Sequence, residues 1–344
     1  MNYADIITEG DRQRQAYKDG IDAYIQHLNR EGYRRREEFM PAEGFEEKIE
    51  AYRACYIKML GNDKMDTSNC PEPSLELCGE DADCRIYRVV VSITPEIPMH
   101  GLLMIPHGTE KAPLVIAQHG GGGTPELCSD MHGKNNYNHM VRRLLARGAV
   151  VFAPQLLLWN YKEALETNPQ HPIPHDRRGA DNDLKRYGMS ITGLEIRGIM
   201  NCITYLSGLS CVDESNIGMV GLSYGGYYTL HTMAADPRIK VGFSNACFND
   251  RNCYPWPDWS YPNSGNTFHD AEVAGLCAPR KLVLAVGKTD LVFDYRSAPE
   301  EAERARKYYA SCGCPENLVF DLWDGGHTLN STDDGFDFLF SAFG

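Results

Sequence analysis

Hydrophobic residues after position 85 occur in short, β-branched runs that are apolar at nearly every position, which is typical of strands buried on both faces of a sheet. Segments with helical spacing separate the later runs, and this alternation predicts a mainly parallel α/β sheet with helices on both faces. The first runs follow one another without helices, so we expect an antiparallel edge there. The eight predicted strands lie in 86–93, 100–106, 113–119, 149–154, 216–221, 239–245, 281–287 and 317–323, and the helices in 137–147, 190–208, 225–235, 297–311 and 334–342.

Residues 1–85 differ in composition from the rest of the chain and are mainly polar and charged. Apolar residues recur at helical spacing around Ile21–Leu28 and again from Phe45 to Tyr56, which predicts two amphipathic helices. The charged run 35–38 is expected to form a solvated helix face, and 70–84, with its prolines and a glycine, a loop. We therefore predict a helical extension over 1–85 that packs on the main domain, 86–344, or on a partner subunit.

Charge and composition exclude several partners. The chain of 344 residues has a net charge of −13, with 34 basic against 47 acidic side chains, so there is no overall positive field to hold nucleic acid. No apolar run approaches the roughly 18 residues of a membrane helix. The N-terminus lacks the features of a signal peptide, so we expect a cytoplasmic protein whose 12 cysteines are reduced. Cys312 and Cys314 have no second pair to complete a zinc site, and we predict no metal.

The most specific motif is Gly221-Leu222-Ser223-Tyr224-Gly225, which follows a predicted strand and precedes a predicted helix. This context is typical of a nucleophile elbow, in which a tight turn presents the serine at the helix N-terminus. The alternative is a glycine-rich turn with an incidental serine.

A nucleophilic serine requires a base, and the base requires an acid that orients it. In this strand and helix order the acid and then the histidine should follow the serine. Asp290 lies just beyond one predicted strand and His327 just beyond the last, and both are expected at the carboxyl edge of the sheet. Asp294 is the rival acid. His231 lies within the helix after the elbow, where a packing role is expected.

The run from His119 to Gly123 supplies a candidate oxyanion hole. Consecutive glycines after a strand let backbone N–H groups approach an acyl oxygen. We assign the donors to Gly121 or Gly122, together with Tyr224. The alternative, a phosphate-binding loop, lacks both the downstream acidic residue of a dinucleotide site and a Gly-Lys-Ser/Thr sequence.

Together these elements resemble the α/β-hydrolase fold, and most closely the serine esterases of the acetyl xylan esterase and dienelactone-hydrolase-like group. The matching stretches run from HGLLMIP through GLSYGG to DGGHTLN, over roughly residues 45–344. The block around the elbow is also similar to prolyl-oligopeptidase-type peptidases. The chain departs from dienelactone hydrolases in having Ser223 where they use cysteine, and from oligopeptidases in lacking a long N-terminal propeller. The resemblance implies that Ser223 is the nucleophile, Asp290 the acid and His327 the base.

The expected activity is hydrolysis of carboxylic esters, with short acyl groups on a sugar or another small polar molecule and with no cofactor. Long loops at 155–188 and 246–276 are expected to contact substrate, with Trp159, Trp256 or Trp259 as a platform for a sugar ring; core packing is the alternative. A peptidase or amidase is a second hypothesis, in which Arg177, Arg178 and Glu195 would hold a peptide terminus. An inactive binding protein is a third. A homo-oligomer is compatible with the sequence.

Overall fold

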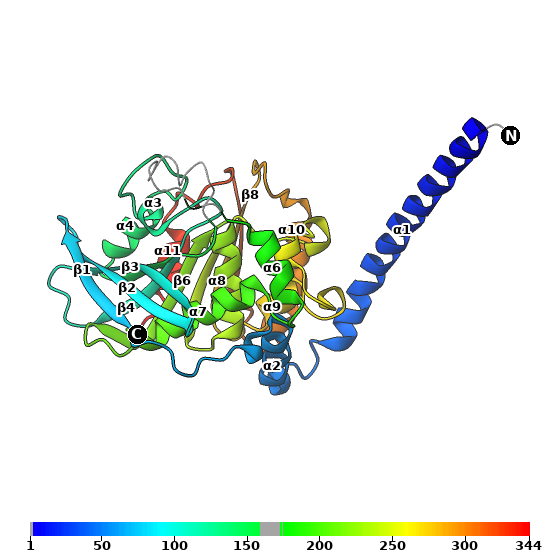
Figure 1. Ribbon diagram of the computed structural model, residues 1–344. Helices are drawn as coiled ribbons and strands as arrows, with labels where there is room; N and C mark the ends of the chain where they lie inside the picture. The colour runs from blue at the N-terminus through cyan, green and yellow to red at the C-terminus, as the bar shows by residue number, and fades with distance from the viewer. Residues whose placement is uncertain (1–2, 159–172, 174) are drawn as a thin grey trace.

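The computed structural model describes residues 3–158, 173 and 175–344 (Figure 1). Its centre is a sheet in which nine described strands have the order β1-β2-β3-β5-β4-β6-β7-β8-β9. β1, β2, β3 and β5 pair antiparallel, and the remaining neighbours pair parallel, as the pattern of runs predicts. The strands are β1 (Ser74–Glu80), β2 (Cys84–Thr94), β3 (Ile97–Pro106), β4 (Ala112–Gln118), β5 (Val150–Pro154), β6 (Val212–Leu222), β7 (Ile239–Asn245), β8 (Lys281–Gly287) and β9 (Leu318–Trp323).

Strand β1 was not among the eight predicted strands, and it lies in the segment 70–84 that was expected to be a loop. Its seven residues are all exposed, so no buried apolar pattern marks it as a strand. It is held at the edge of the sheet by pairing with β2, and the register shifts between Leu77 and Gly79. Such an irregularity accommodates a glycine at a sheet edge, which is why the glycine did not end the strand.

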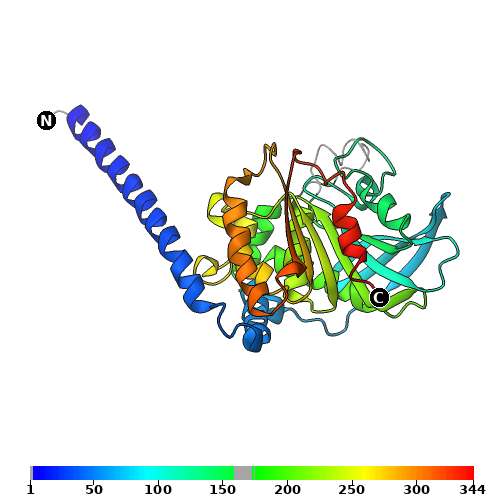
Figure 2. The same cartoon turned by 180° about the vertical axis from the view of Figure 1, so that it is seen from behind.

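Helices cover both faces of the sheet, as predicted (Figures 1 and 2). One apolar core lies under the helices that include α7 and α8, and a second lies on the other face under α4 and α11. The α-helices are α1 (Tyr3–Phe39), α2 (Ile49–Leu60), α3 (Pro125–Cys128), α4 (Met140–Leu145), α6 (Arg177–Lys185), α7 (Ile191–Leu206), α8 (Tyr224–Ala235), α9 (Asp270–Gly275), α10 (Ala298–Ser311) and α11 (Asp334–Phe340). Short 3₁₀ turns include η4 (Pro257–Trp259) and η5 (Ser264–Asn266).

The extension begins with α1, which projects away from the rest of the molecule and reaches it only near its C-terminal end (Figures 1 and 2). There Arg36 is 1% exposed, its Nε lies 3.2 Å from an Oε of Glu272, and its guanidinium donates to the carbonyl of Gly265. The expectation of a solvated face at 35–38 is therefore wrong for Arg36, because a buried carboxylate on a distant helix supplies its partner. The division of the chain at residue 85 stays a prediction.

In the described part of the chain, no helix is long and apolar enough to cross a membrane. The parallel strands β4, β6, β7, β8 and β9 point their carboxyl ends to one edge of the sheet. The loops that leave this edge carry most of the residues singled out by the sequence.

Candidate active site

Ser223 occupies the sharp turn between β6 and α8. Its backbone has φ 61° and ψ −120°, a conformation that costs free energy in a non-glycine residue and that clusters at functional sites. The turn is possible because Gly221 and Gly225 have no side chains: a Cβ on Gly221 would overlap the backbone of Gly225, and one on Gly225 would overlap the carbonyl of Gln118. The glycines of the motif therefore bring the strand and the helix into contact around the serine.

His327 and Asp290 form a hydrogen-bonded pair beyond the ends of β9 and β8. Nδ1 of His327 lies 2.8 Å from Oδ2 of Asp290. Because an ionised carboxylate only accepts, Nδ1 carries the proton and Nε2 is left to accept one. Burial alone raises the pKa of Asp290, but the hydrogen bonds from His327 and from the N–H groups of Phe293 and Val292 outweigh it and hold that pKa below its usual value. The rival acid Asp294 instead pairs with Arg296.

Two asparagines hold the histidine loop, and sequence reasoning missed both. The side chain of Asn136 donates to the carbonyl of His327 at 2.8 Å. Asn245, the last residue of β7, accepts the N–H of Ser223 at its backbone carbonyl (2.8 Å) and donates from its side chain to the carbonyl of Thr328 (2.8 Å). Asn245 thus connects the elbow to the residue after His327. The signal in the sequence that could have identified Asn245 is a polar residue at the carboxyl end of an apolar run, and the structure buries it fully.

The glycine loop after β4 lies against the elbow. A Cβ added to Gly120 would lie 3.3 Å from Cβ of Ser223. His119 is buried, which lowers its pKa to about 4, and its Nδ1 lies 2.9 Å from the carbonyl oxygen of Gly120. The N–H of Gly122 already donates to the carbonyl of Leu158 at 2.5 Å. Of the two glycines singled out as oxyanion donors, the geometry therefore favours Gly121.

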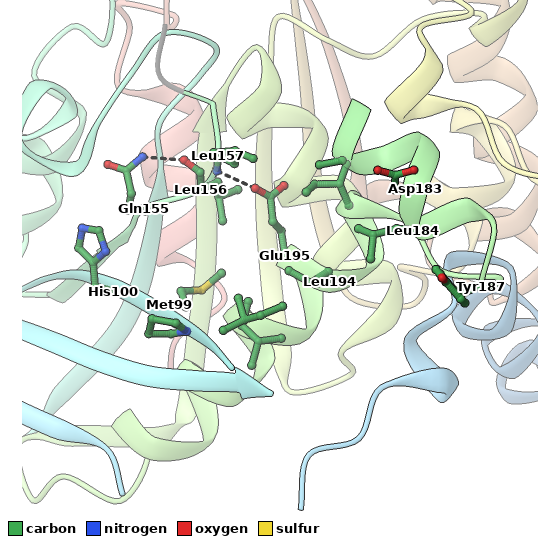
Figure 3. Close-up of a pocket in the computed structure, with 15 residues that line it drawn as sticks. Met99, His100, Gln155, Leu156, Leu157, Asp183, Leu184, Tyr187, Leu194 and Glu195 are labelled. Atoms are coloured by element: carbon green, nitrogen blue, oxygen red, sulfur yellow. Dashed lines mark hydrogen bonds between the residues drawn. The ribbon is translucent and has the colours of Figure 1, made fainter. Parts of the chain in front are cut away.

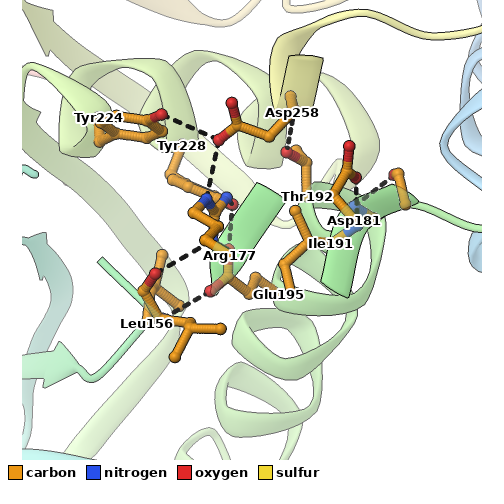
Figure 4. A network of polar contacts seen from close by, with 12 residues as sticks. Leu156, Arg177, Asp181, Ile191, Thr192, Glu195, Tyr224, Tyr228 and Asp258 are labelled. Carbon is orange, nitrogen blue, oxygen red and sulfur yellow. Dashed lines mark hydrogen bonds and ion pairs between the residues drawn. The ribbon is translucent and has the colours of Figure 1, made fainter. Parts of the chain in front are cut away.

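Tyr224 supplies the other candidate donor, and its side chain joins a buried polar network (Figure 4). As the first residue of α8, Tyr224 has an N–H without a partner in a preceding helical turn. Its hydroxyl donates to Asp258 at 2.9 Å, and Arg177 bridges Asp258 (2.8 Å) and Glu195 (2.9 Å). Because Arg177 and Glu195 neutralise each other, neither is free to hold the terminus of a peptide.

Aromatic rings line the same region. Trp256 is partly exposed and lies between Tyr224 and Phe293, with ring centroids 5.7 and 5.4 Å away, and Phe293 in turn lies 5.8 Å from the ring of His327. Trp259 is 2% exposed and stacks on Tyr227 at 4.4 Å, so it packs in the core and offers no open face. Trp159, the remaining tryptophan singled out, lies outside the described residues.

A pocket of about 550 Å³ opens beside this network, between β3, α6 and α7 (Figure 3). Its walls are mostly apolar, and Glu195 belongs both to the pocket and to the Arg177 network. Oε1 of Glu195 also accepts the N–H of Leu157 at 2.7 Å, which fixes the start of the loop after β5. The remaining lining residues are Ile93, Ile97, Pro98, Met99, His100, Gln155, Leu156, Ala180, Asp183, Leu184, Tyr187, Ile191 and Leu194.

His231 has the packing role expected of it. It is 4% exposed, its ring stacks on Tyr227 with centroids 3.8 Å apart, and Nδ1 lies 2.5 Å from the hydroxyl of Tyr56. Burial lowers its pKa well below the usual histidine value. Among the described residues, no three histidine, cysteine or acidic side chains are grouped so that they could hold a metal ion.

Replacing Arg177 with methionine should destabilise the protein strongly. The side chains of Glu195 and Asp258 are only 4% and 3% exposed, and the substitution would leave both carboxylates without their cation. Removal of one partner from a buried ion pair costs about 3–5 kcal/mol. Urea unfolding should report this loss, whereas Arg178→Met, at the adjacent exposed position, should change the free energy of unfolding by less than about 0.5 kcal/mol. Equal effects of the two substitutions would contradict the role given to the network.

Part of the sequence and most of the fold are similar to those of known proteins. The profile of the prolyl oligopeptidase family matches residues 191–267, which contain the elbow. Among curated protein sequences, none matches. Many solved structures resemble the chain. A methylesterase has a TM-score of 0.65 at 19% identity, covering 87% of this chain and 64% of that one, so this chain spans less than two thirds of that protein.

Two further structures match over most of both chains. A glucuronoyl esterase from Solibacter usitatus has a TM-score of 0.59 at 15% identity, covering 84% of this chain and 92% of its own. Acetyl xylan esterase 1 from Thermoanaerobacterium sp. has a TM-score of 0.55 at 15% identity, covering 87% and 94%. These likenesses confirm the predicted fold: the protein has the α/β-hydrolase fold.

Proposed function

We propose that the protein is a serine esterase that removes short acyl groups, such as acetyl, from a sugar or another small polar molecule. The observation that carries the proposal is the His327–Asp290 pair, 2.8 Å apart, in a loop that Asn245 ties to the turn holding Ser223. The names of the structural neighbours, which include a methylesterase, a glucuronoyl esterase and an acetyl xylan esterase, support an ester substrate attached to a carbohydrate. The cytoplasmic location stays a prediction.

In this mechanism Ser223 attacks the ester carbonyl while Nε2 of His327 accepts the serine proton. Asp290 holds the imidazole in orientation and stabilises its positive charge. The N–H groups of Gly121 and Tyr224 donate to the oxyanion of the tetrahedral intermediate. His327 then returns the proton to the leaving alcohol. Water, activated by the same histidine, hydrolyses the acyl-enzyme and releases the acid.

Trp256 is the residue we propose for contact with the alcohol part of the substrate. It is the partly exposed tryptophan beside Tyr224 and Phe293, and an aromatic face suits the apolar face of a sugar ring. The buried position of Trp259 removes it from this role.

The direct test compares ester and amide substrates on the purified protein. We expect p-nitrophenyl acetate to be hydrolysed and aminoacyl-p-nitroanilides to be untouched, and a fluorophosphonate probe to label one serine per chain. EDTA should leave the activity unchanged, because backbone N–H groups and side chains supply every step. Panels of acetylated xylo-oligosaccharides and of methyl esters of uronic acids would then define the substrate. Ester turnover that vanished with EDTA and returned with zinc would overturn the proposal.

A peptidase is the second candidate, because the family profile that matches residues 191–267 is that of prolyl oligopeptidases. The ion pair between Arg177 and Glu195 counts against it, since two of the three groups that were expected to bind a peptide terminus are occupied by each other, and the third, Arg178, is exposed. Faster cleavage of an aminoacyl-p-nitroanilide than of p-nitrophenyl acetate would favour the peptidase.

A further inference from the structure

The long helix α1 carries an unusual amount of exposed apolar surface. Of the fifteen large apolar side chains that are exposed in the described part of the chain, eight lie on this one helix. Their exposed fractions run from 37% for Leu28 to 75% for Tyr17. We call these eight residues the apolar stripe: Tyr3, Ile6, Ile7, Tyr17, Ile21, Tyr24, Ile25 and Leu28.

The stripe is narrow, and Gly10 and Arg14 interrupt it between Ile7 and Tyr17. With about 100° of rotation per residue, its eight members fall within an arc of about 100° on the helix surface. The same arc continues to Gly32 and Phe39, where α1 meets the body: Gly32 lies against the carbonyl of Gly265, and Phe39 packs edge to face on Phe268 at 5.2 Å. The exposed stripe is therefore the continuation of a face that the helix already buries.

The contacts near the C-terminal end of α1 fix the direction of the helix. Arg36 pairs with Glu272, the hydroxyl of Tyr33 contacts Asp250, and the guanidinium of Arg304 lies over the ring of Tyr33 at 4.1 Å. Residues 3–28 then extend about 39 Å beyond this anchor at 1.5 Å per residue (Figures 1 and 2). Most of the stability of a helix in a protein comes from the packing of its apolar face, so a partner for this exposed face is expected.

We propose that the apolar stripe binds the apolar stripe of a second copy of this chain, and that the two α1 helices form an antiparallel coiled coil. The spacing alternates between four and three residues along Tyr3, Ile7, Gly10, Arg14, Tyr17, Ile21, Tyr24 and Leu28, which is the heptad pattern of such a pair. In an antiparallel register centred on residue 19, the members of this pattern from Gly10 to Leu28 face one another in pairs, as a two-fold interface requires.

The paired layers match in size and chemistry. Tyr17 faces the partner's Ile21, and Gly10 leaves room for the partner's Leu28. Arg14, the only charged member of the spacing, faces the ring of the partner's Tyr24, where a cation–π contact can form. A parallel pair would instead place Arg14 against the partner's Arg14, and like charges in contact disfavour that arrangement.

A membrane surface is a poorer match, because residues 3–30 carry five acidic and four basic side chains and lack the basic face that binds anionic lipid.

Sedimentation velocity on the full chain tests the proposal, and it needs no substrate, so its result is independent of the proposed function. We expect a dimer. Ile21→Glu should raise the dimer dissociation constant by at least about tenfold, because it places a charge in the apolar contact. Gln26→Glu adds the same charge on the opposite, exposed face of the helix and should leave the dimer intact.

Charged substitutions at Tyr24 test the antiparallel register, because Tyr24 faces the partner's Arg14 in that register. Tyr24→Lys should weaken the dimer by opposing that Arg14, whereas Tyr24→Glu can pair with it and should weaken the dimer less. A monomer at micromolar concentrations would overturn the proposal, as would a dimer that Ile21→Glu leaves unchanged. Flotation of a monomeric wild-type chain with phosphatidylserine vesicles would assign the stripe to a membrane instead. Equal weakening by Tyr24→Lys and Tyr24→Glu would reject the antiparallel register.

Discussion

Ser223→Ala should abolish ester hydrolysis while leaving the fold intact. The side chain lies at the sheet edge, and the strain at this turn is held by contacts among Gly221, Gly225 and Asn245, none of which the substitution changes. Removal of a triad nucleophile costs on the order of a million-fold in turnover. Steady-state hydrolysis of p-nitrophenyl acetate would measure the loss, and thermal unfolding would establish that the variant folds.

The matched control is Ser215→Ala, at an exposed position near the start of β6. It should retain full turnover and full labelling by a fluorophosphonate. Residual activity of Ser223→Ala within tenfold of the wild type would rule out Ser223 as the nucleophile, and labelling of Ser223→Ala would point to a different serine.

Asp290→Asn should lower turnover by about ten thousand-fold, by analogy with amidation of other triad acids. The amide can donate where the carboxylate only accepts, so it favours the imidazole tautomer that cannot take the proton of Ser223. The shape of the site is kept, because Oδ1 can still accept the N–H groups of Val292 and Phe293. Turnover of p-nitrophenyl acetate is the measurement.

Asp294→Asn is the control, because Asp294 pairs with exposed Arg296 and has no contact with His327 among the described interactions. A larger loss at Asp294 than at Asp290 would reverse the assignment. The lowered pKa of Asp290 also determines how its contribution to stability depends on pH. This contribution is complete above the ordinary aspartate pKa of about 3.9, and it is lost only as the pH falls through the lower pKa of the folded state.

Local sequence patterns were sufficient for most of the fold. The strand runs 239–245 and 281–287 coincide with β7 and β8 to the residue, because buried parallel strands are apolar at nearly every position. The elbow was predictable because its glycines and its strained serine are required at fixed spacing. The pairing of His327 with Asp290 followed from chain order and from the shared edge of the sheet.

The features that were missed depend on partners far away in the sequence. The sequence around Arg36 predicts a surface charge, because its partner Glu272 is far away in the sequence. Strand β1 has no apolar pattern, because it is fully exposed and is stabilised by pairing with β2. Likewise, nothing near Gly122 reveals that its N–H is engaged by Leu158, which is 36 residues further on. Such contacts arise when the chain folds, and local periodicity carries no information about them.

The position of Asn245 indicates which neighbouring residues can change without moving Ser223 or His327. The elbow and the histidine loop are fastened to each other through Asn245 at the end of β7. In the segment 246–276 that follows, Asp258 and Trp259 are buried, and Asp258 accepts the hydroxyl of Tyr224, so these positions are constrained together with the elbow. Trp256 in the same segment is partly exposed. Substitution at position 256 should therefore change the substrate range while Ser223 and His327 keep their relative positions.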